Sequence, residues 1–210
     1  MQKTYDCFEK KYPSYWILKN RFKNNKGDFM EFNNHSFMVD ILDNEQNIIV
    51  QKAAQIGMST CELFRILHKV SLNPGVTWIY VLPTETDVRD FAMVKVQSII
   101  KQNKNLPFRA SSARERLETK ITPPSFIMFK GTWTEREAII IDADGLTYDE
   151  LDRCNMDVLT MYESRILNSK YQFLDRFSTP TYPEYGVNEW YEKSCQYHWF
   201  IKCSRCGVWQ

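Results

Sequence analysis

The stretch "QKAAQIGMST", residues 51–60, has the outline of a phosphate-binding loop that follows a β-strand. In the usual pattern, G-x-x-x-x-G-K-[ST], backbone N–H groups at a helix N-terminus cradle phosphates, the lysine reaches the terminal phosphates and the hydroxyl binds magnesium. Gly57 and Ser59 fit this pattern, but Met58 replaces the lysine and Lys52 stands at the first glycine position. Lys52 is therefore a candidate for the displaced charge. An ordinary strand-to-helix turn with a glycine is the alternative, and the loop alone does not decide between them.

Composition sets the broad class. The 210 residues are 43% hydrophobic and 25% charged, as in a globular domain, and no stretch approaches the roughly 18 apolar residues of a membrane helix. The N-terminus carries charges and aromatics where a signal peptide would be apolar, so we expect a cytoplasmic location. A formal net charge of +1 restricts nucleic-acid contact to local basic stretches, here residues 19–26 and 101–116.

Hydrophobic periodicity predicts an α/β fold. Strands are expected over residues 47–51, 75–84, 125–133, 137–149 and 171–181, and helices over residues 36–42, from 59 onward, 85–103 and 157–169. Residues 104–120 are charged with little periodicity and are interpreted as a loop or short helix. Alternating strands and helices imply a mainly parallel sheet with helices on both faces, preceded here by a short N-terminal helical extension.

A pair of acidic residues follows the strand-like run in "GLTYDELDR", residues 145–153. Asp149 could hold magnesium, while Glu150 could polarise a water for attack on a γ-phosphate. Asp142 and Asp144 form a competing acidic site, and spacing does not choose between the two pairs.

Seven segments occur in an order that resembles one family, the large terminase subunit of tailed bacteriophages, in particular the N-terminal DNA-packaging ATPase of its lambda-like, GpA-type members. The segments are "QKAAQIGMST", "YVLPTETDVRDF", "FKGTW", "DADGLTYDELDR", "ESRI", "STPTYPEYG" and "CSRCG". The resemblance runs from about Phe29 to the C-terminus. It implies a P-loop NTPase of the ASCE/RecA-like class that hydrolyses ATP with Mg²⁺ to move double-stranded DNA into a procapsid.

The resemblance also implies roles for individual residues. The nucleotide would lie on Lys52, Ala53, Ala54, Gln55, Ile56, Gly57, Met58, Ser59 and Thr60. Lys52 takes the role of the lysine, Asp149 and Ser59 would hold magnesium, and Glu150 matches the catalytic glutamate, which favours this acidic pair over Asp142.

Two further features follow from the same family. Ser178, Thr179, Pro180 and Thr181 match the coupling motif that senses the γ-phosphate. An arginine finger is also expected in this family, because an arginine can stabilise the transition-state charge. Arg89, Arg153 and Arg165 are candidates, with Arg165 preferred, and each has an alternative role in a surface ion pair.

Cys203 and Cys206 have zinc-knuckle spacing but supply only two of the four ligands that zinc needs, so the pair either binds zinc or consists of free cysteines. We expect an N-terminal lid over residues 1–30, the ATPase domain over 31–195, and a linker from 196 to 210 toward a nuclease domain absent from this chain.

The partners implied are double-stranded DNA, the portal protein, the small terminase subunit and further copies of the chain in a ring on the procapsid, with no membrane. The chain would act in the host cytoplasm and transiently at the portal vertex. Two alternatives stay open: a nucleotide-binding assembly module with little turnover, and a helicase-like ATPase of superfamily 2.

Overall fold

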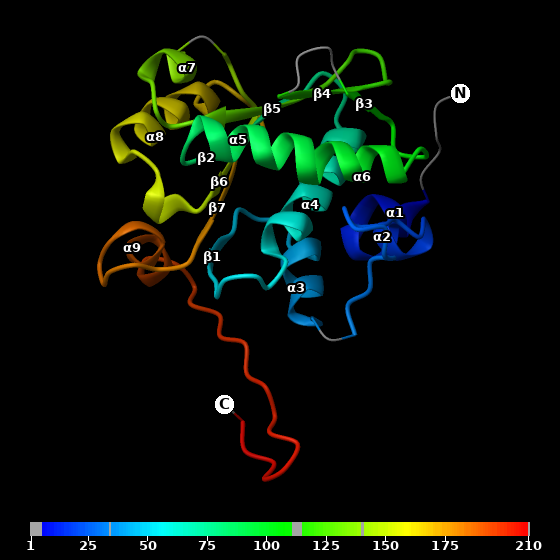
Figure 1. Ribbon diagram of the computed structural model, residues 1–210, viewed down its shortest axis with the longest axis vertical. Helices are drawn as coiled ribbons and strands as arrows, with labels where there is room; N and C mark the ends of the chain where they lie inside the picture. The colour runs from blue at the N-terminus through cyan, green and yellow to red at the C-terminus, as the bar shows by residue number, and fades with distance from the viewer. Residues whose placement is uncertain (1–5, 34, 111–114, 140, 210) are drawn as a thin grey trace.

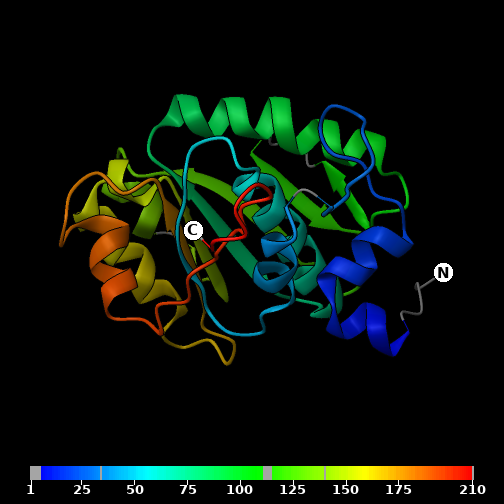
Figure 2. The same ribbon diagram turned by 90° about the horizontal axis from the view of Figure 1, so that it is seen from below.

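The centre of the molecule is a seven-stranded sheet in the order β1-β7-β6-β2-β5-β4-β3, with helices on both faces (Figures 1 and 2). The computed structural model describes residues 6–33, 35–110, 115–139 and 141–209. The strands are β1 (Ile49–Gln51), β2 (Thr77–Leu82), β3 (Phe108–Ala110), β4 (Arg116–Thr119), β5 (Phe126–Gly131), β6 (Gly145–Asp149) and β7 (Phe173–Ser178). Neighbours from β1 through β7, β6 and β2 to β5 pair in parallel, whereas β4 and β3 are antiparallel. The predicted mainly parallel sheet flanked by helices is confirmed.

The two faces of the sheet carry separate hydrophobic cores because side chains alternate along each strand. On β2, Trp78 and Tyr80 enter one core while Ile79 and Val81 enter the other. The first core also receives α2, α3, α4 and the helical run from α5 to α6, and the second receives α7, α8 and α9. The helices are α1 (Cys7–Lys11), α2 (Pro13–Lys19), α3 (Phe37–Asp43), α4 (Met58–Leu72), α5 (Glu85–Asp90), α6 (Gln97–Gln102), α7 (Glu135–Ile139), α8 (Met156–Glu163) and α9 (Gly186–Glu192).

Three short segments depart from the α-helix. A π-helical segment, Phe91–Val96, joins α5 to α6, so that 85–102 is one continuous helical run. Two 3₁₀ turns, Leu151–Arg153 and Ser164–Ile166, follow β6 and α8 respectively.

Two of the predicted elements are wrong. Residues 104–120 contain strands β3 and β4 instead of a loop or helix, and on β4 only alternate side chains, Leu117 and Thr119, are buried. The charged outward side of these strands hides the period of two. Strand structure was also expected from residue 137, but Glu135–Ile139 is the helix α7, which buries Ala138, and β6 begins only at Gly145.

The amino ends of the central strands are tightly fixed. A Cβ at Gly145 would lie 2.5 Å from the indole of Trp78 on β2, so only glycine fits there. Just before β6, the Asp144 carboxylate accepts hydrogen bonds from the Thr77 N–H at 2.9 Å and from the Ser169 hydroxyl at 2.6 Å. Asp144, half of the competing acidic pair, therefore lies at the end of β6 opposite to Asp149.

The N-terminal extension consists of α1 and α2. Trp16 and Ile17 on α2 are fully buried, and the Trp16 ring lies 5.2 Å from the His68 ring on α4, so this extension packs against the domain. The segment after α9 runs away from the sheet (Figure 1). No helix in the described ranges is long and apolar enough to cross a membrane.

Candidate nucleotide site

The loop between β1 and α4 lies at the carboxyl edge of the parallel strands. Gln51 ends β1 and Met58 begins α4, one residue earlier than the expected Ser59. Gly57 precedes the helix with φ 86°, a left-handed conformation that favours glycine, and its carbonyl accepts the N–H groups of Thr60 and Cys61. The loop thus leads into the N-terminus of a 15-residue helix, where free N–H groups and the helix dipole favour an anion.

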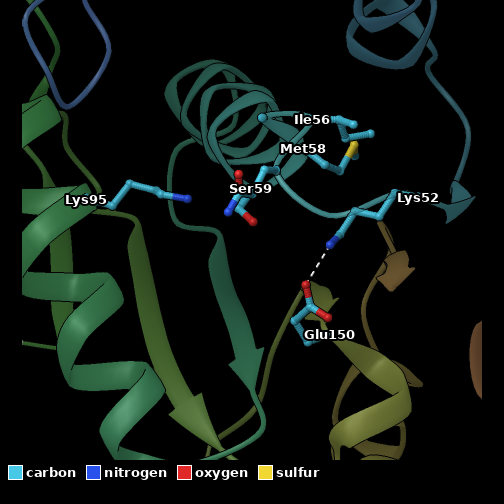
Figure 3. A pocket seen from close by; sticks show the side chains of 8 residues that line it. Lys52, Ile56, Met58, Ser59, Lys95 and Glu150 are labelled. Atoms are coloured by element: carbon cyan, nitrogen blue, oxygen red, sulfur yellow. Dashed lines mark hydrogen bonds and ion pairs between the residues drawn. The ribbon is translucent and has the colours of Figure 1, made fainter. Parts of the chain in front are cut away.

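A cavity of about 290 Å³ lies against this loop (Figure 3). Its lining residues are Lys52, Gln55, Ile56, Gly57, Met58, Ser59, Lys95 and Glu150. Six of the nine loop residues predicted to bind nucleotide line it, whereas Ala53, Ala54 and Thr60 do not. The cavity also brings in Glu150 from the end of β6, as expected from the parallel topology.

Lys52 and Glu150 form an ion pair in this cavity. Their Nζ and Oε1 atoms lie 2.6 Å apart, and Lys52 is only 8% exposed. Glu150 adopts the left-handed conformation, with φ 55°, directly after β6. The backbone N–H of Lys52 also donates to the carbonyl of Ser178, the last residue of β7. Lys52 therefore connects the loop to the carboxyl ends of both β6 and β7.

Asp149, the last residue of β6, directly precedes Glu150 and is 3% exposed. Its Oδ2 accepts a hydrogen bond from the Tyr80 hydroxyl at 2.8 Å. Burial raises the pKa of Asp149 above the usual range of a carboxyl group, while the nearby hydroxyls of Ser59 and Tyr80 and the charge of Lys52 act in the opposite direction. Oδ1 is buried and forms no hydrogen bond with any of the described residues. One carboxylate oxygen beside Ser59 thus remains available to a cation.

Met58 is primarily a core residue. It is 2% exposed and belongs to the hydrophobic cluster that includes Met38 on α3. Figure 3 shows its side chain on the same side as Ile56, away from Lys95. The usual lysine position of the loop is therefore occupied by a side chain that is buried in the hydrophobic core.

The predicted coupling motif follows β7 and is bonded to the segment after β6. The Asp152 carboxylate accepts hydrogen bonds from Thr181 and from the N–H of Val187, while the N–H of Asp152 donates to the Ser178 hydroxyl at 3.2 Å. Asp152 was not predicted as a functional residue, although it lies inside "GLTYDELDR". Its position three residues after Asp149 was the only available signal.

The three arginines lie in different places. Arg165 follows α8, and its carbonyl accepts the N–H of Ala143 near the amino end of β6, so the structure does not bring it to the cavity. Arg165 is not among the residues that line the cavity, and its role as an arginine finger stays a prediction. Arg89 is exposed and paired with Glu85 at 3.0 Å. Arg153 lines a second cavity, which shares Glu150 with the first.

Cys203 and Cys206 lie in a turn of the C-terminal segment, where the Gly207 N–H donates to the Cys203 carbonyl. Backbone N–H groups of Cys206 and Arg205 lower the pKa of the Cys203 thiol. Within the described ranges, no group of three or more His, Cys, Asp or Glu side chains is placed to hold a metal ion.

Solved structures with the same fold include phage packaging enzymes. A mutant form of the Thermus phage P74-26 large terminase ATPase domain aligns with a TM-score of 0.64 at 15% identity, over 81% of this chain and 71% of its own. The same domain in another structure gives 0.51 at 16% identity, and the chain spans 57% of its length. The large terminase of the thermophilic bacteriophage D6E in complex with ADP gives 0.53 at 10% identity, over 70% of this chain and 36% of its own.

At these identities the structural likeness concerns the fold alone. No curated protein matches the chain in sequence. The family is established by a different comparison, because residues 35–210 match the model described as phage terminase large subunit gpA, ATPase domain. This match covers most of the chain and includes the loop, the end of β6 and the turn after β7, so the chain belongs to the family of phage terminase large subunit ATPase domains.

Proposed function

We propose that this domain hydrolyses ATP in the cavity beside the 52–57 loop and uses the hydrolysis to move double-stranded viral DNA into a procapsid. The observation that carries the proposal is the 2.6 Å ion pair between Lys52 and Glu150. This pair joins Lys52, the candidate replacement for the usual loop lysine, to Glu150, which directly follows the buried strand β6. Family membership favours this function over that of a superfamily 2 helicase.

The ion pair suggests how the two residues work together. Phosphate oxygens of ATP would compete with Glu150 for the Lys52 ammonium group, because both are anions within reach of the same donor. A Glu150 carboxylate released from Lys52 can orient a water and accept its proton as the water oxygen attacks the γ-phosphorus. The bond from the γ-phosphorus to the ADP oxygen then breaks, giving ADP and inorganic phosphate.

Asp149 and Ser59 fit a magnesium ion beside the cavity. Asp149 offers a buried oxygen that lacks a hydrogen bond with the described residues, and the Ser59 hydroxyl is near it. Magnesium in such sites is held by one or two protein oxygens together with phosphates and waters, so a single carboxylate is sufficient. When bound, magnesium would neutralise charge that develops on the phosphate oxygens. Asp149 and Ser59 would orient it, and Tyr80 would orient Asp149.

The turn after β7 would couple ATP hydrolysis to the movement of DNA. Ser178 contacts both the loop, through the Lys52 N–H, and Asp152. A change at the γ-phosphate could therefore reach Thr179, Pro180 and Thr181 through short hydrogen-bonded steps, consistent with a coupling motif.

Two basic stretches provide a candidate DNA surface. Asn103 binds the backbone of Lys23 through two hydrogen bonds of 2.8 Å, so residues 19–26 and 101–110 lie side by side. Exposed cations in these stretches without an ion pair to any described residue include Arg21, Lys26, Lys101 and Lys104. Such a group suits contact with DNA phosphates without base readout.

The whole motor would involve more chains. We propose a homo-oligomeric ring on the procapsid, with the portal protein and the small terminase subunit as partners, acting in the host cytoplasm and at the portal vertex. In such a ring, Arg165 of one subunit could act as the arginine finger in the nucleotide cavity of its neighbour.

Release of phosphate from ATP in the presence of Mg²⁺ tests the proposal. We expect the parent chain to hydrolyse ATP, Lys52→Ala to lose both binding and hydrolysis, and Glu150→Gln to bind ATP without hydrolysis. Hydrolysis by Lys52→Ala at the parent rate would show that the displaced-lysine mechanism is wrong. ATP binding by the parent without turnover, even at high protein concentration, would instead support the nucleotide-binding assembly module.

A further inference from the structure

A second lysine enters the nucleotide cavity from the helical run on the other side. Lys95 lies in the π-helical segment Phe91–Val96 and lines the cavity with Ser59 and Glu150. Figure 3 shows Lys95 and Lys52 extending from opposite sides toward the space below the loop. No feature of the phosphate-loop pattern points to Lys95, since it is 43 residues beyond Lys52 in the chain.

The charged side chains that line the cavity carry a net positive charge, which favours the binding of an anion. Three charged side chains line it, and two of them, Lys52 and Glu150, neutralise each other in their ion pair. Lys95 forms no ion pair with any residue in the described ranges; its ammonium group lies 5.2 Å from the centre of the Phe91 ring. Among the described residues, Lys95 is therefore the lining cation without an ion-pair partner.

The local backbone accounts for the position of Lys95. The N–H of Gln97 donates to the carbonyl of Ala92, an i→i+5 bond that widens this turn relative to an α-helix. Single π-helical turns of this kind are rare and are frequently found at functional sites. Phe91, Ala92 and Val96 are buried beneath the turn and fix its orientation, while Lys95 stays half-buried at the cavity wall.

We infer that Lys95 binds the phosphate chain of the nucleotide and, together with Lys52, replaces the lysine that Met58 removed from the loop. This inference rests on the proposed ATP site. Burial lowers the pKa of Lys95, Lys52 lowers it further, and Asp149 raises it. These effects agree with an ammonium group that is partly withdrawn from solvent.

Binding of a non-hydrolysable ATP analogue, the β,γ-imido triphosphate, and of ADP to the full chain with Mg²⁺ tests this inference by calorimetry. A charge-assisted hydrogen bond to phosphate predicts that Lys95→Met weakens binding by about tenfold to a hundredfold. Lys95→Arg, which keeps the charge, should retain most of the affinity. Lys170→Met removes an exposed charge that does not line the cavity and should bind like the parent.

Weakened binding of the triphosphate alone would place Lys95 at the γ-phosphate, and weakened binding of both nucleotides would place it at the β-phosphate. Either result supports the inference. Parent-like affinity of a folded Lys95→Met for both nucleotides, with Lys52→Met defective, would overturn it while leaving the proposed function intact. Absence of nucleotide binding by the parent would instead refute both.

Discussion

The carboxylate of Asp152 accepts two hydrogen bonds from Thr181, one from the backbone N–H at 2.8 Å and one from the hydroxyl at 2.9 Å. A third comes from the N–H of Val187 at 2.8 Å, at the start of α9. A Cβ at Gly186 would lie 2.4 Å from Asp152, so glycine is required beside this carboxylate. The segment after β6 and the turn after β7 therefore behave as one hydrogen-bonded unit.

Asp152→Ala should destabilise the domain because it leaves three donors without their charged acceptor. We expect the free energy of unfolding to fall by about 2–4 kcal/mol, and the loss to be smaller in Asp152→Asn, whose amide oxygen still accepts. Urea unfolding followed by circular dichroism measures both values. Nucleotide binding by Asp152→Asn should stay near that of the parent, since Asp152 does not line the cavity beside the loop.

Asp142→Ala is the matched control. Asp142 is exposed and belongs to the competing acidic pair, so its loss should change the free energy of unfolding by no more than about 0.5 kcal/mol. Equal effects of the two alanine substitutions would contradict the role assigned to Asp152.

Met58→Lys restores the usual loop lysine, yet we expect it to impair the protein. Met58 is 2% exposed in a hydrophobic cluster, and a buried charge without a partner costs about 3 kcal/mol or more. Thermal unfolding should therefore occur at a lower temperature, with no gain in ATP hydrolysis. Met58→Leu, of similar volume, should cost less than about 1.5 kcal/mol. If Met58→Lys instead hydrolyses ATP faster at unchanged stability, the loop is a usual phosphate-binding loop that has lost its lysine, and position 58 does not need an apolar side chain.

Glu62 should make the stability of the domain depend on pH. It is fully buried on α4, and burial together with the neighbouring charge of Asp175 raises the pKa of Glu62 to about 8. In the unfolded chain its pKa would be about 4.3. Between these values the folded state keeps a proton that the unfolded state releases, so the free energy of unfolding decreases as pH rises, by up to about 1.4 kcal/mol per pH unit.

Glu62→Gln should remove this contribution, so its stability relative to the parent increases with pH. Its amide oxygen can still accept the Thr147 hydroxyl, which donates to Glu62 at 3.1 Å. Urea unfolding between about pH 5.5 and 7.5 measures the slope. Glu45→Gln changes an exposed carboxyl and should keep the parent slope. Parallel slopes for Glu62→Gln and the parent would show that Glu62 titrates as an ordinary carboxyl.

Cys203 should react with iodoacetamide faster than Cys206 at about pH 8. Backbone N–H groups lower the pKa of the Cys203 thiol and so increase its thiolate fraction, and the thiolate is the reactive form. Peptide mass spectrometry of samples quenched over time gives both rates. Equimolar zinc should protect neither thiol, because two sulfurs supply half of a tetrahedral site. Protection of both would indicate that zinc recruits further ligands to the turn.

The parts of the fold with a clear period were predictable from the sequence. The β1 strand, the helix after Gly57 and strand β7 occur where apolar spacing placed them, within three residues at each end. Strands β3 and β4 could not be recognised, because charged residues such as Arg109 and Glu118 occupy their exposed side and pair with each other across the two strands. Helix α7 was taken for a strand because its few residues include an apolar run too short to show a helical period.

The site residues that could be predicted from the sequence are those in motifs that directly follow a strand. Lys52 and Glu150 belong to separate motifs, and parallel pairing of β1, β7 and β6 brings both to one cavity. Lys95 was missed because its position depends on a π-helical turn that spacing does not reveal. Tyr80 was missed because a strand residue's hydrogen bond to Asp149 depends on the register between β2 and β6.

The close packing of Gly145 against the Trp78 ring distinguishes the two ends of β6. At the amino end of β6, the Trp78 indole on β2 fills the space that a side chain at Gly145 would need. After the carboxyl end of β6, Glu150 and Asp152 form polar contacts, an ion pair with Lys52 and hydrogen bonds with Thr181 and Val187 respectively. The two ends of β6 are therefore held by different kinds of contact, side-chain packing at the amino end and polar contacts just beyond the carboxyl end, where Glu150 lines the cavity.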